Sequence, residues 1–357
     1  MTRHNPRRRT RALVLLPVIG LLATGCGGGE ETTFTAAPAA DAPTTAPSCY
    51  EGETATFVVP FSPGGGYDTI ARGIAPFLKD ELGADAVVVE NKPGAGGLVA
   101  ANGIYNAKPD GLTFGLFAAQ GIVGSSMAGA SGATFDPEKF TYVARLAQDA
   151  RVLLASPQSG FASIEDLESA GPLQYATAGS GAADHVDANV LPTVLGLDNV
   201  QIVTGFEGSA ETELAVTAGT VQLGSGTLGT RFNSIENGDQ VAVLLMGRER
   251  AEDLPDVPAL LELDLGDKQE LAEAYVGLQE VGRSVFAPPE MEEGCLAQLQ
   301  AGLEATLSDP KFEAQIGDSV DVPFEYADGE VLREAVNSVL NAPEELVTLL
   351  QKAYAGE

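Results

Sequence analysis

A short apolar segment, three consecutive glycines and the start of a helix follow one another in residues 57–72. This order predicts a buried strand, a glycine-rich turn and a helix. Glycine can adopt positive φ values that point successive N–H groups into one concavity, and the start of a helix adds the positive end of its dipole. We therefore expect Gly64, Gly65 and Gly66 to form an anion site from backbone alone, able to hold a carboxylate or a phosphate.

Strand-like and helix-like segments alternate along most of the chain. The expected strands share short apolar and β-branched runs, and they are residues 56–61, 86–89, 112–118, 151–155, 174–178, 200–204, 221–224, 241–246 and 284–287. The expected helices share apolar residues at helical spacing, and they are residues 68–82, 98–107, 163–170, 184–195, 210–218, 292–307 and 329–354. This alternation predicts an α/β protein with parallel strands joined by right-handed crossovers.

The helices of the last third have no sheet of their own. The economical arrangement is that the chain passes to a second domain near residue 150 and returns near residue 280. We expect domain 1 to contain residues 53–150 and 281–357, and domain 2 to contain residues 151–280.

The N-terminus has the composition of an export signal. Five arginines precede an apolar run that ends in Thr24-Gly25-Cys26. Small residues before a cysteine are typical of a bacterial lipoprotein signal, so we expect residues 1–25 to be removed and Cys26 to be lipidated. Ordinary cleavage and an uncleaved anchor are the alternatives. Residues 26–52 are rich in Gly, Ala, Pro and Thr, which predicts a disordered tether.

Acidic residues dominate the charge of the chain. The formal charge is −30, and removal of residues 1–25 takes away five arginines and no acid, which leaves −35. Such a surface repels nucleic acid and anionic lipid, so neither is an expected partner. An anionic ligand would need a locally positive pocket, which backbone N–H groups can supply.

Two cysteines remain in the mature chain, Cys49 and Cys295. Export to an oxidising compartment allows a disulfide between them. Sequence does not show whether their Cα atoms come within bonding range, so a disulfide and two free thiols both stay open.

Catalytic and cofactor motifs find little support. The chain has no Gly-x-x-x-x-Gly-Lys-Ser/Thr motif, and Gly179-Ser-Gly181 lacks the third glycine of a dinucleotide site. The only histidines are His4 and His185, so we expect no metal, no cofactor and no enzyme activity. Asp68 opens a helix and serves either as its cap or as a ligand contact. His185 is either a hydrogen-bonded residue of a helix start or a ligand contact.

Three sequence blocks resemble the Bug family, the solute receptors of tripartite tricarboxylate transporters. They are Val58-Val-Pro-Phe-Ser-Pro-Gly-Gly-Gly-Tyr-Asp-Thr-Ile-Ala-Arg72, Val89-Glu-Asn-Lys-Pro-Gly-Ala-Gly-Gly97 and Ala107-Lys-Pro-Asp-Gly111. The resemblance implies a periplasmic-binding-protein (Venus flytrap) fold. In that fold two α/β domains, each a mixed, mostly parallel sheet flanked by helices, are joined by a two-stranded hinge and close on an organic anion.

The resemblance also implies where the ligand lies. Loops of both domains hold its carboxylate with main-chain groups. With Gln120 and His185 added, the expected ligand-binding residues are Ser62, Gly64, Gly65, Gly66, Tyr67, Asp68, Gln120, Thr177, Gly179, Ser180, Gly181, Asp184, His185, Gly208 and Ser209. We expect a monomeric, lipid-anchored extracytoplasmic receptor that delivers a small organic acid to one small and one large membrane subunit.

Two departures from the family pattern concern the ligand. Asp184 stands beside His185 where the family commonly has Ser-His-Leu, and Glu207 replaces the lysine of a Pro-Tyr-Lys-Gly turn. Both add negative charge, which favours a mono- or dicarboxylate, aromatic and amino-bearing acids included, over a tricarboxylate. The alternative functions are an exported hydrolase that uses Asp68 or His185, and a sensory receptor with the same fold.

Overall fold

The structure, a computed structural model, describes residues 48–355 except residues 149, 181, 207 and 317–322. The predicted signal peptide, Cys26 and most of the predicted tether lie outside the described residues. Within them, no helix has the length and apolar character needed to cross a membrane.

A mixed sheet of six strands organises what we call the first lobe. Its strands are β1 (Thr54–Val59), β2 (Ala86–Asn91), β3 (Thr113–Ala118), β4 (Thr141–Ala147), β10 (Arg283–Ala287) and β11 (Ala327–Asp328), in the order β11-β4-β10-β3-β1-β2. Strand β1 pairs in parallel with β2 and β3, whereas β10 runs antiparallel to β3 and β4.

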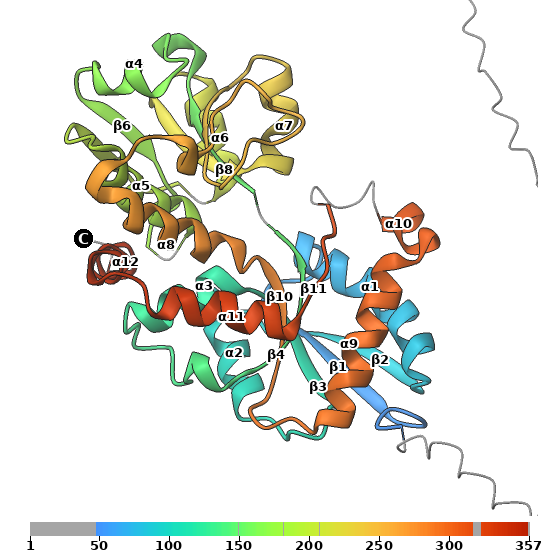
Figure 1. The fold of residues 1–357 in the computed structure, drawn as a ribbon. Coiled ribbons are helices and arrows are strands. Elements are labelled where there is room, and N and C mark those ends of the chain that lie inside the picture. The colour runs from blue at the N-terminus through green and yellow to red at the C-terminus, as the bar shows by residue number, and fades with distance from the viewer. Residues whose placement is uncertain (1–47, 149, 181, 207, 317–322, 356–357) are drawn as a thin grey trace, which may run out of the picture. The chain divides into compact units, whose positions relative to one another are not determined.

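Helices cover both faces of this sheet (Figure 1). The first-lobe helices are α1 (Gly66–Leu82), α2 (Leu98–Tyr105), α3 (Ala119–Met127), α9 (Glu293–Ser308), α10 (Pro310–Ile316) and α11 (Gly329–Leu340). Alternation along β1 separates two cores, because successive side chains of a strand point to opposite faces. Phe57 and Val59 pack with α1, α9 and α10, whereas Val58 packs with α2, α3 and α11.

A second mixed sheet of five strands organises the second lobe. Its strands are β5 (Arg151–Ala155), β6 (Leu173–Ala176), β7 (Val200–Val203), β8 (Leu223–Thr227) and β9 (Val241–Leu245), in the order β7-β6-β8-β5-β9. The helices of this lobe are α4 (Ile164–Glu168), α5 (Ala183–Leu195), α6 (Ser209–Thr217) and α7 (Leu228–Glu236). Leu153 packs on the α5 side of the sheet, and its neighbours Val152 and Leu154 pack on the α7 side. The two-lobed α/β fold predicted above is confirmed.

The chain passes between the lobes at two places, between β4 and β5 and just before β10. Gly282 makes the second passage possible. Its φ is +52°, and a Cβ at this position would lie 2.2 Å from the carbonyl oxygen of Ala147. Only glycine lets the two crossing segments come this close.

Two further helices contact both lobes. Helix α8 (Gln269–Glu280) packs against α3 and α11 and also against α5, and α12 (Glu344–Ala355) packs against α3 and α5. Because α8 belongs to neither lobe alone, the domain boundaries at residues 150 and 280 stay a prediction. Five short 3-10 segments complete the description: Ala95–Gly97, Pro137–Lys139, Pro157–Ser159, Leu260–Glu262 and Gly266–Lys268.

The expectation of one helical region over residues 329–354 is corrected by the structure. Helix α11 ends at Leu340, and α12 begins at Glu344. Pro343 lies in the break, where its missing N–H and its ring prevent the helix from continuing.

Cys49 and Cys295 form a disulfide with a Cα–Cα distance of 5.5 Å. The bridge fastens the chain just before β1 to α9 in the first lobe. Of the two alternatives left open by the sequence, the structure contains the disulfide.

Candidate functional site

The glycine loop between β1 and α1 differs from the expected geometry. Of the three glycines only Gly64 has a positive φ, +88°, whereas Gly65 is extended and Gly66 is the first residue of α1. The prediction that three successive positive φ values build the anion site is therefore wrong. The N–H groups of the first turn of α1 still lack acceptors within the helix, as at any helix start. Two residues of this turn, Gly66 and Tyr67, line a surface hollow formed by residues 61–67.

The carboxylate of Asp68 holds this loop through hydrogen bonds. Its Oδ2 accepts the N–H of Gly64 at 2.8 Å and the Nε–H of Arg72 at 3.0 Å, and its Oδ1 accepts from Asn91 Nδ2 at 2.8 Å. Burial opposes ionisation of this carboxyl group, but these hydrogen bonds and the charge of Arg72 lower its pKa overall. Asp68 is thus a buried carboxylate with donors on both oxygens, and the N–H of Gly64 points to it.

Asn91 ties the same loop to β2. Its Nδ2 also donates to the carbonyl oxygen of Phe61 at 3.0 Å, and its Oδ1 accepts from Arg72 Nη2 at 2.8 Å. The loop is therefore held at Phe61 and at Gly64 by side chains from two elements. Asn91 was not among the expected site residues.

A carboxylate at the start of helix α5 makes a comparable hydrogen bond to the preceding loop in the second lobe. Asp184 lies in the first turn of this helix, and its Oδ2 accepts the N–H of Ala178 in the preceding loop at 3.1 Å. Its Oδ1 is buried and has no partner among the described residues. Burial and the nearby charge of Asp187 raise the pKa of Asp184, and the hydrogen bond from Ala178 and the charge of Arg151 oppose them.

His185 is held by Thr177 at the end of β6. Its Nδ1 lies 2.9 Å from Thr177 Oγ1, and its Nε2 is buried without a partner among the described residues. Burial lowers the pKa of His185, which keeps the ring neutral at pH 7.

A cavity of about 240 Å³ lies where both lobes contribute helix starts. It is found at the carboxyl ends of β1, β3 and β6, the position at which α/β sheets commonly bind ligands. The residues that line it come from both lobes and from α8 and α12: Phe61, Gly96, Ala118, Gln120, Gly121, Ala182, Ala183, Val186, Leu278, Gln279 and Tyr354. Among these described residues none carries a charge.

The expected site residues are distributed unevenly around this cavity. Gln120 lines it directly. Five of them, Ser62, Gly64, Gly65, Gly66 and Tyr67, form the adjacent hollow, which shares Phe61 with the cavity. Four buried ones, Asp68, Thr177, Asp184 and His185, brace the loops or the start of a helix. Gly179 and Ser180 lie in the loop before α5, Gly208 and Ser209 lie at the start of α6, and Gly181 lies outside the described residues.

Arg283 is a basic residue next to the hollow that the sequence analysis did not single out. Its guanidinium lies 4.9 Å from the centre of the Tyr67 ring, and its Nη1 would be 3.8 Å from a Cβ on Gly66. The residue begins β10, directly after the passage between the lobes. It is distant in sequence from the glycine loop, so no local pattern could have placed it there.

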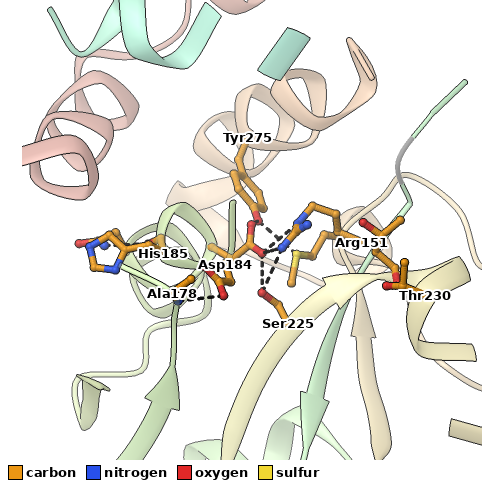
Figure 2. Close-up of polar contacts among 11 residues, drawn as sticks. Arg151, Ala178, Asp184, His185, Ser225, Thr230 and Tyr275 are labelled. Carbon is orange, nitrogen blue, oxygen red and sulfur yellow. Dashed lines mark hydrogen bonds and ion pairs between the residues drawn. The ribbon is translucent and has the colours of Figure 1, made fainter. Parts of the chain in front are cut away.

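A buried ionic network lies in the second lobe (Figure 2). Arg151 pairs with Asp187 of α5, and Ser225 Oγ donates to the same carboxylate at 2.6 Å. Tyr275 OH, from α8, donates to Asp187 Oδ1 at 2.6 Å. The network thus connects α8 to α5, and it was not predicted. The sequence did offer two signals of such a network. Arg151 begins an apolar strand, and Asp187 lies on the buried face of a helix.

Comparison with known proteins decides the family. The sequence profile described as "Tripartite tricarboxylate transporter family receptor" matches residues 70–339. The chain belongs to this family. A UPF0065 protein of Bordetella pertussis is 26% identical over 291 residues, which are 77% of this chain and 83% of that protein.

Two solved structures share the fold. The periplasmic binding protein BugD has a TM-score of 0.62 at 26% identity, with 86% of this chain and 99% of BugD covered. MatC from Rhodopseudomonas palustris, solved with bound malate, has a TM-score of 0.62 at 26% identity, with 84% of this chain and 99% of MatC covered.

Membership of this family assigns a general role. The receptor is an extracytoplasmic solute-binding protein of the Bug type and not an enzyme, so the hydrolase alternative is set aside. The fold expected from the three sequence blocks is the fold observed.

Proposed function

We propose that this receptor captures a small organic carboxylate and delivers it to the membrane subunits of a tripartite tricarboxylate-type transporter. The observation that carries the proposal is the cavity at which helices from both lobes begin. MatC, which shares the fold, binds malate. The ligand-binding residues expected from the sequence are part of this proposal, except that Asp68 and Asp184 act through the loops that they hold.

Helix starts supply the positive potential for the anion. The first N–H groups of α1 and of α5 have no acceptor within their helices, and the helix dipole favours negative charge at this end. Ala182 and Ala183 bring the start of α5 to the cavity, and the hollow beside it contains the start of α1. A chain with a formal charge of −30 needs such local donors to hold an anion.

Arg283 adds a full positive charge to the same region. In our proposal its guanidinium, stacked on Tyr67, faces the ligand carboxylate across the glycine loop. Asp68 and Asp184 act as positioning residues, since each fastens a loop whose N–H groups meet the ligand. Because the two lobes each contribute part of the site, ligand binding favours the closed arrangement of the lobes.

Thermal-shift screening of the mature receptor against a library of organic acids tests this function, followed by isothermal titration of each acid that raises the melting temperature. We expect at least one acid to bind at a 1:1 ratio. Arg283→Gln should weaken binding by roughly 10- to 100-fold, the range for a hydrogen bond to a charged group. The exposed control Arg333→Gln should bind as the wild type does. If no acid of the library binds in the thermal-shift screen or in isothermal titration, the proposal is wrong.

Membrane attachment is proposed through Cys26. Replacing this residue with alanine should move the protein from the membrane fraction to the soluble extracytoplasmic fraction, because one lipid anchor is lost. Lipid labelling of the wild-type chain provides the direct measurement. A monomeric receptor that co-purifies with one small and one large membrane protein would complete the expected assembly. An unlabelled wild-type chain would contradict the anchor but not the ligand-binding role.

A further inference from the structure

Two glutamine side chains in the cavity have no hydrogen-bond partner among the described residues. Gln279 is 6% exposed, and its Oε1 and that of Gln120 are buried and unpaired. An unsatisfied buried polar group costs about 1–3 kcal/mol. Both residues line one cavity, so a ligand bound there would lie beside two amides that lack partners and could satisfy them once the side chains turn toward it.

Backbone hydrogen bonds connect the two elements that carry these glutamines. The N–H of Gly282 donates to the carbonyl oxygen of Gln279 at 3.2 Å, and the N–H of Ala119 donates to the carbonyl oxygen of Gly282 at 2.9 Å. Gln279 at the end of α8 and Gln120 at the start of α3 are thus connected through the segment that passes between the lobes. Both side chains line the same cavity.

The surroundings of the two amides are neutral. The described lining residues carry no charge, and Arg283, the cation proposed to face the ligand carboxylate, lies at the glycine loop and is not among them. A second carboxylate at this end of the ligand would lose its hydration without gaining a cation, which is costly. A neutral group that both donates and accepts hydrogen bonds has no such penalty.

We propose that Gln120 and Gln279 form a subsite for an uncharged amide or hydroxyl group of the ligand, so that the receptor selects a monocarboxylate with a neutral polar end. This inference rests on the proposed function and narrows its substrate class. The cavity volume of about 240 Å³ is about eight times the ~30 Å³ that one water occupies in the liquid, which suits a small acid.

Titration calorimetry with matched acids tests the subsite on the whole mature receptor. The probes are succinamate, succinate and butyrate, and then glutaramate, glutarate and pentanoate, so that only the end group varies at each length. We expect the half-amide to bind about 10-fold or more tightly than the dicarboxylate of the same length. Gln279→Leu should weaken half-amide binding about 10-fold, as expected for a lost hydrogen bond, and leave binding of the unsubstituted acid unchanged.

Gln269→Leu is the matched control, because this residue lies at the other end of α8 and its amide donates to Glu273 at the exposed surface. It should bind all probes as the wild type does. If Gln279→Leu does not fold, Gln120→Leu takes its place with the same expectation.

Three results would overturn the subsite. They are a dicarboxylate that binds as well as its half-amide, a glutamine variant that weakens every probe equally, and a receptor that binds an acid of the library but no half-amide. These results leave carboxylate capture intact. If no acid of the library binds, both carboxylate capture and the glutamine subsite are wrong.

Discussion

Asp68 and Asp184 occupy corresponding places in the two lobes. Each lies in the first turn of a helix, and each accepts a backbone N–H from the loop before that helix, from Gly64 at 2.8 Å and from Ala178 at 3.1 Å. The pKa values of the two carboxyl groups shift in opposite directions. Donors on both oxygens lower the pKa of Asp68, whereas burial raises the pKa of Asp184, one oxygen of which is unpaired.

The first prediction concerns Asp184→Asn. Because burial and Asp187 raise the pKa of Asp184, the folded state binds this proton more tightly than the unfolded chain does. The wild type should therefore lose stability as pH rises from about 4, the unfolded value, through the folded pKa. Asparagine does not titrate, so the variant should melt at a higher temperature than the wild type at pH 7.5, and this advantage should shrink at pH 4.

Differential scanning calorimetry at both pH values provides the measurement for Asp184→Asn. The control is Asp198→Asn in the same lobe, since Asp198 is exposed and should leave the melting temperature unchanged. A variant that melts below the wild type at pH 7.5 would show that the charge of Asp184 stabilises the fold.

Much of the fold could be predicted from local sequence patterns. The strands β1, β2 and β3 are short apolar runs, β1 and β2 end at glycine- and proline-containing turns, and the helices between the three strands carry apolar residues at helical spacing. Helix α3 was not expected, because Gly121, Gly124 and two serines lower its intrinsic propensity, and tertiary packing supplies what propensity does not. Strand β4 and helix α8 were not expected either, although each has an ordinary apolar pattern. Their packing against segments far along the chain is also not visible in their sequences.

The second prediction concerns the passage between the lobes. Gly282→Ala should lower the free energy of unfolding by about 3–5 kcal/mol, because the new Cβ meets the carbonyl oxygen of Ala147 and φ is positive. Gly266→Ala is the matched control: its φ is +54° and nothing lies within 4 Å of the new Cβ, so only backbone strain of about 1–2 kcal/mol remains. Urea denaturation gives both values, and equal losses would contradict the close crossing.

The third prediction concerns the disulfide. The bridge closes a sequence separation of 246 residues, so Cys49→Ala with Cys295→Ala should lower the free energy of unfolding by about 2–5 kcal/mol. A reductant should lower the melting temperature of the wild type and have no effect on the double variant. Mass spectrometry with a thiol-alkylating reagent would count the free thiols, and two in the untreated wild type would contradict the bridge.

The candidate site was less predictable than the fold. The glycine loop was located from sequence, but its geometry depends on Asn91, which lies 23 residues after Asp68 and donates to it across the loop. Arg283 and Gln279 reach the site only because the chain returns from the second lobe beside α3. Which residues meet across such distances in sequence depends on the topology of the fold. A periodic sequence pattern predicts only the single helix or strand in which it occurs.

The fourth prediction concerns Asp68→Asn. The amide replaces one acceptor oxygen by a donor that faces Gly64, Arg72 or Asn91, so at pH 7.5 the free energy of unfolding should fall by about 1–3 kcal/mol. The glycine loop should lose its fixed position, and carboxylate affinity should fall with it. Asp80→Asn is the control on the same helix, because the Asp80 side chain is 79% exposed and should change neither quantity.

The pH dependence of the Asp68 effect distinguishes a charged brace from a packing effect. The folded pKa of Asp68 is lowered, since hydrogen bonds from Arg72, Gly64 and Asn91 and the charge of Arg72 outweigh the opposing effect of burial. Its contribution is therefore present above the unfolded value of about 4 and is lost as pH falls through the folded pKa. Denaturation curves recorded between pH 7.5 and the lowest pH at which both proteins fold should show the wild type and Asp68→Asn converging. A gap that stays constant over this range would mean that the shape of the side chain, and not its charge, holds Gly64.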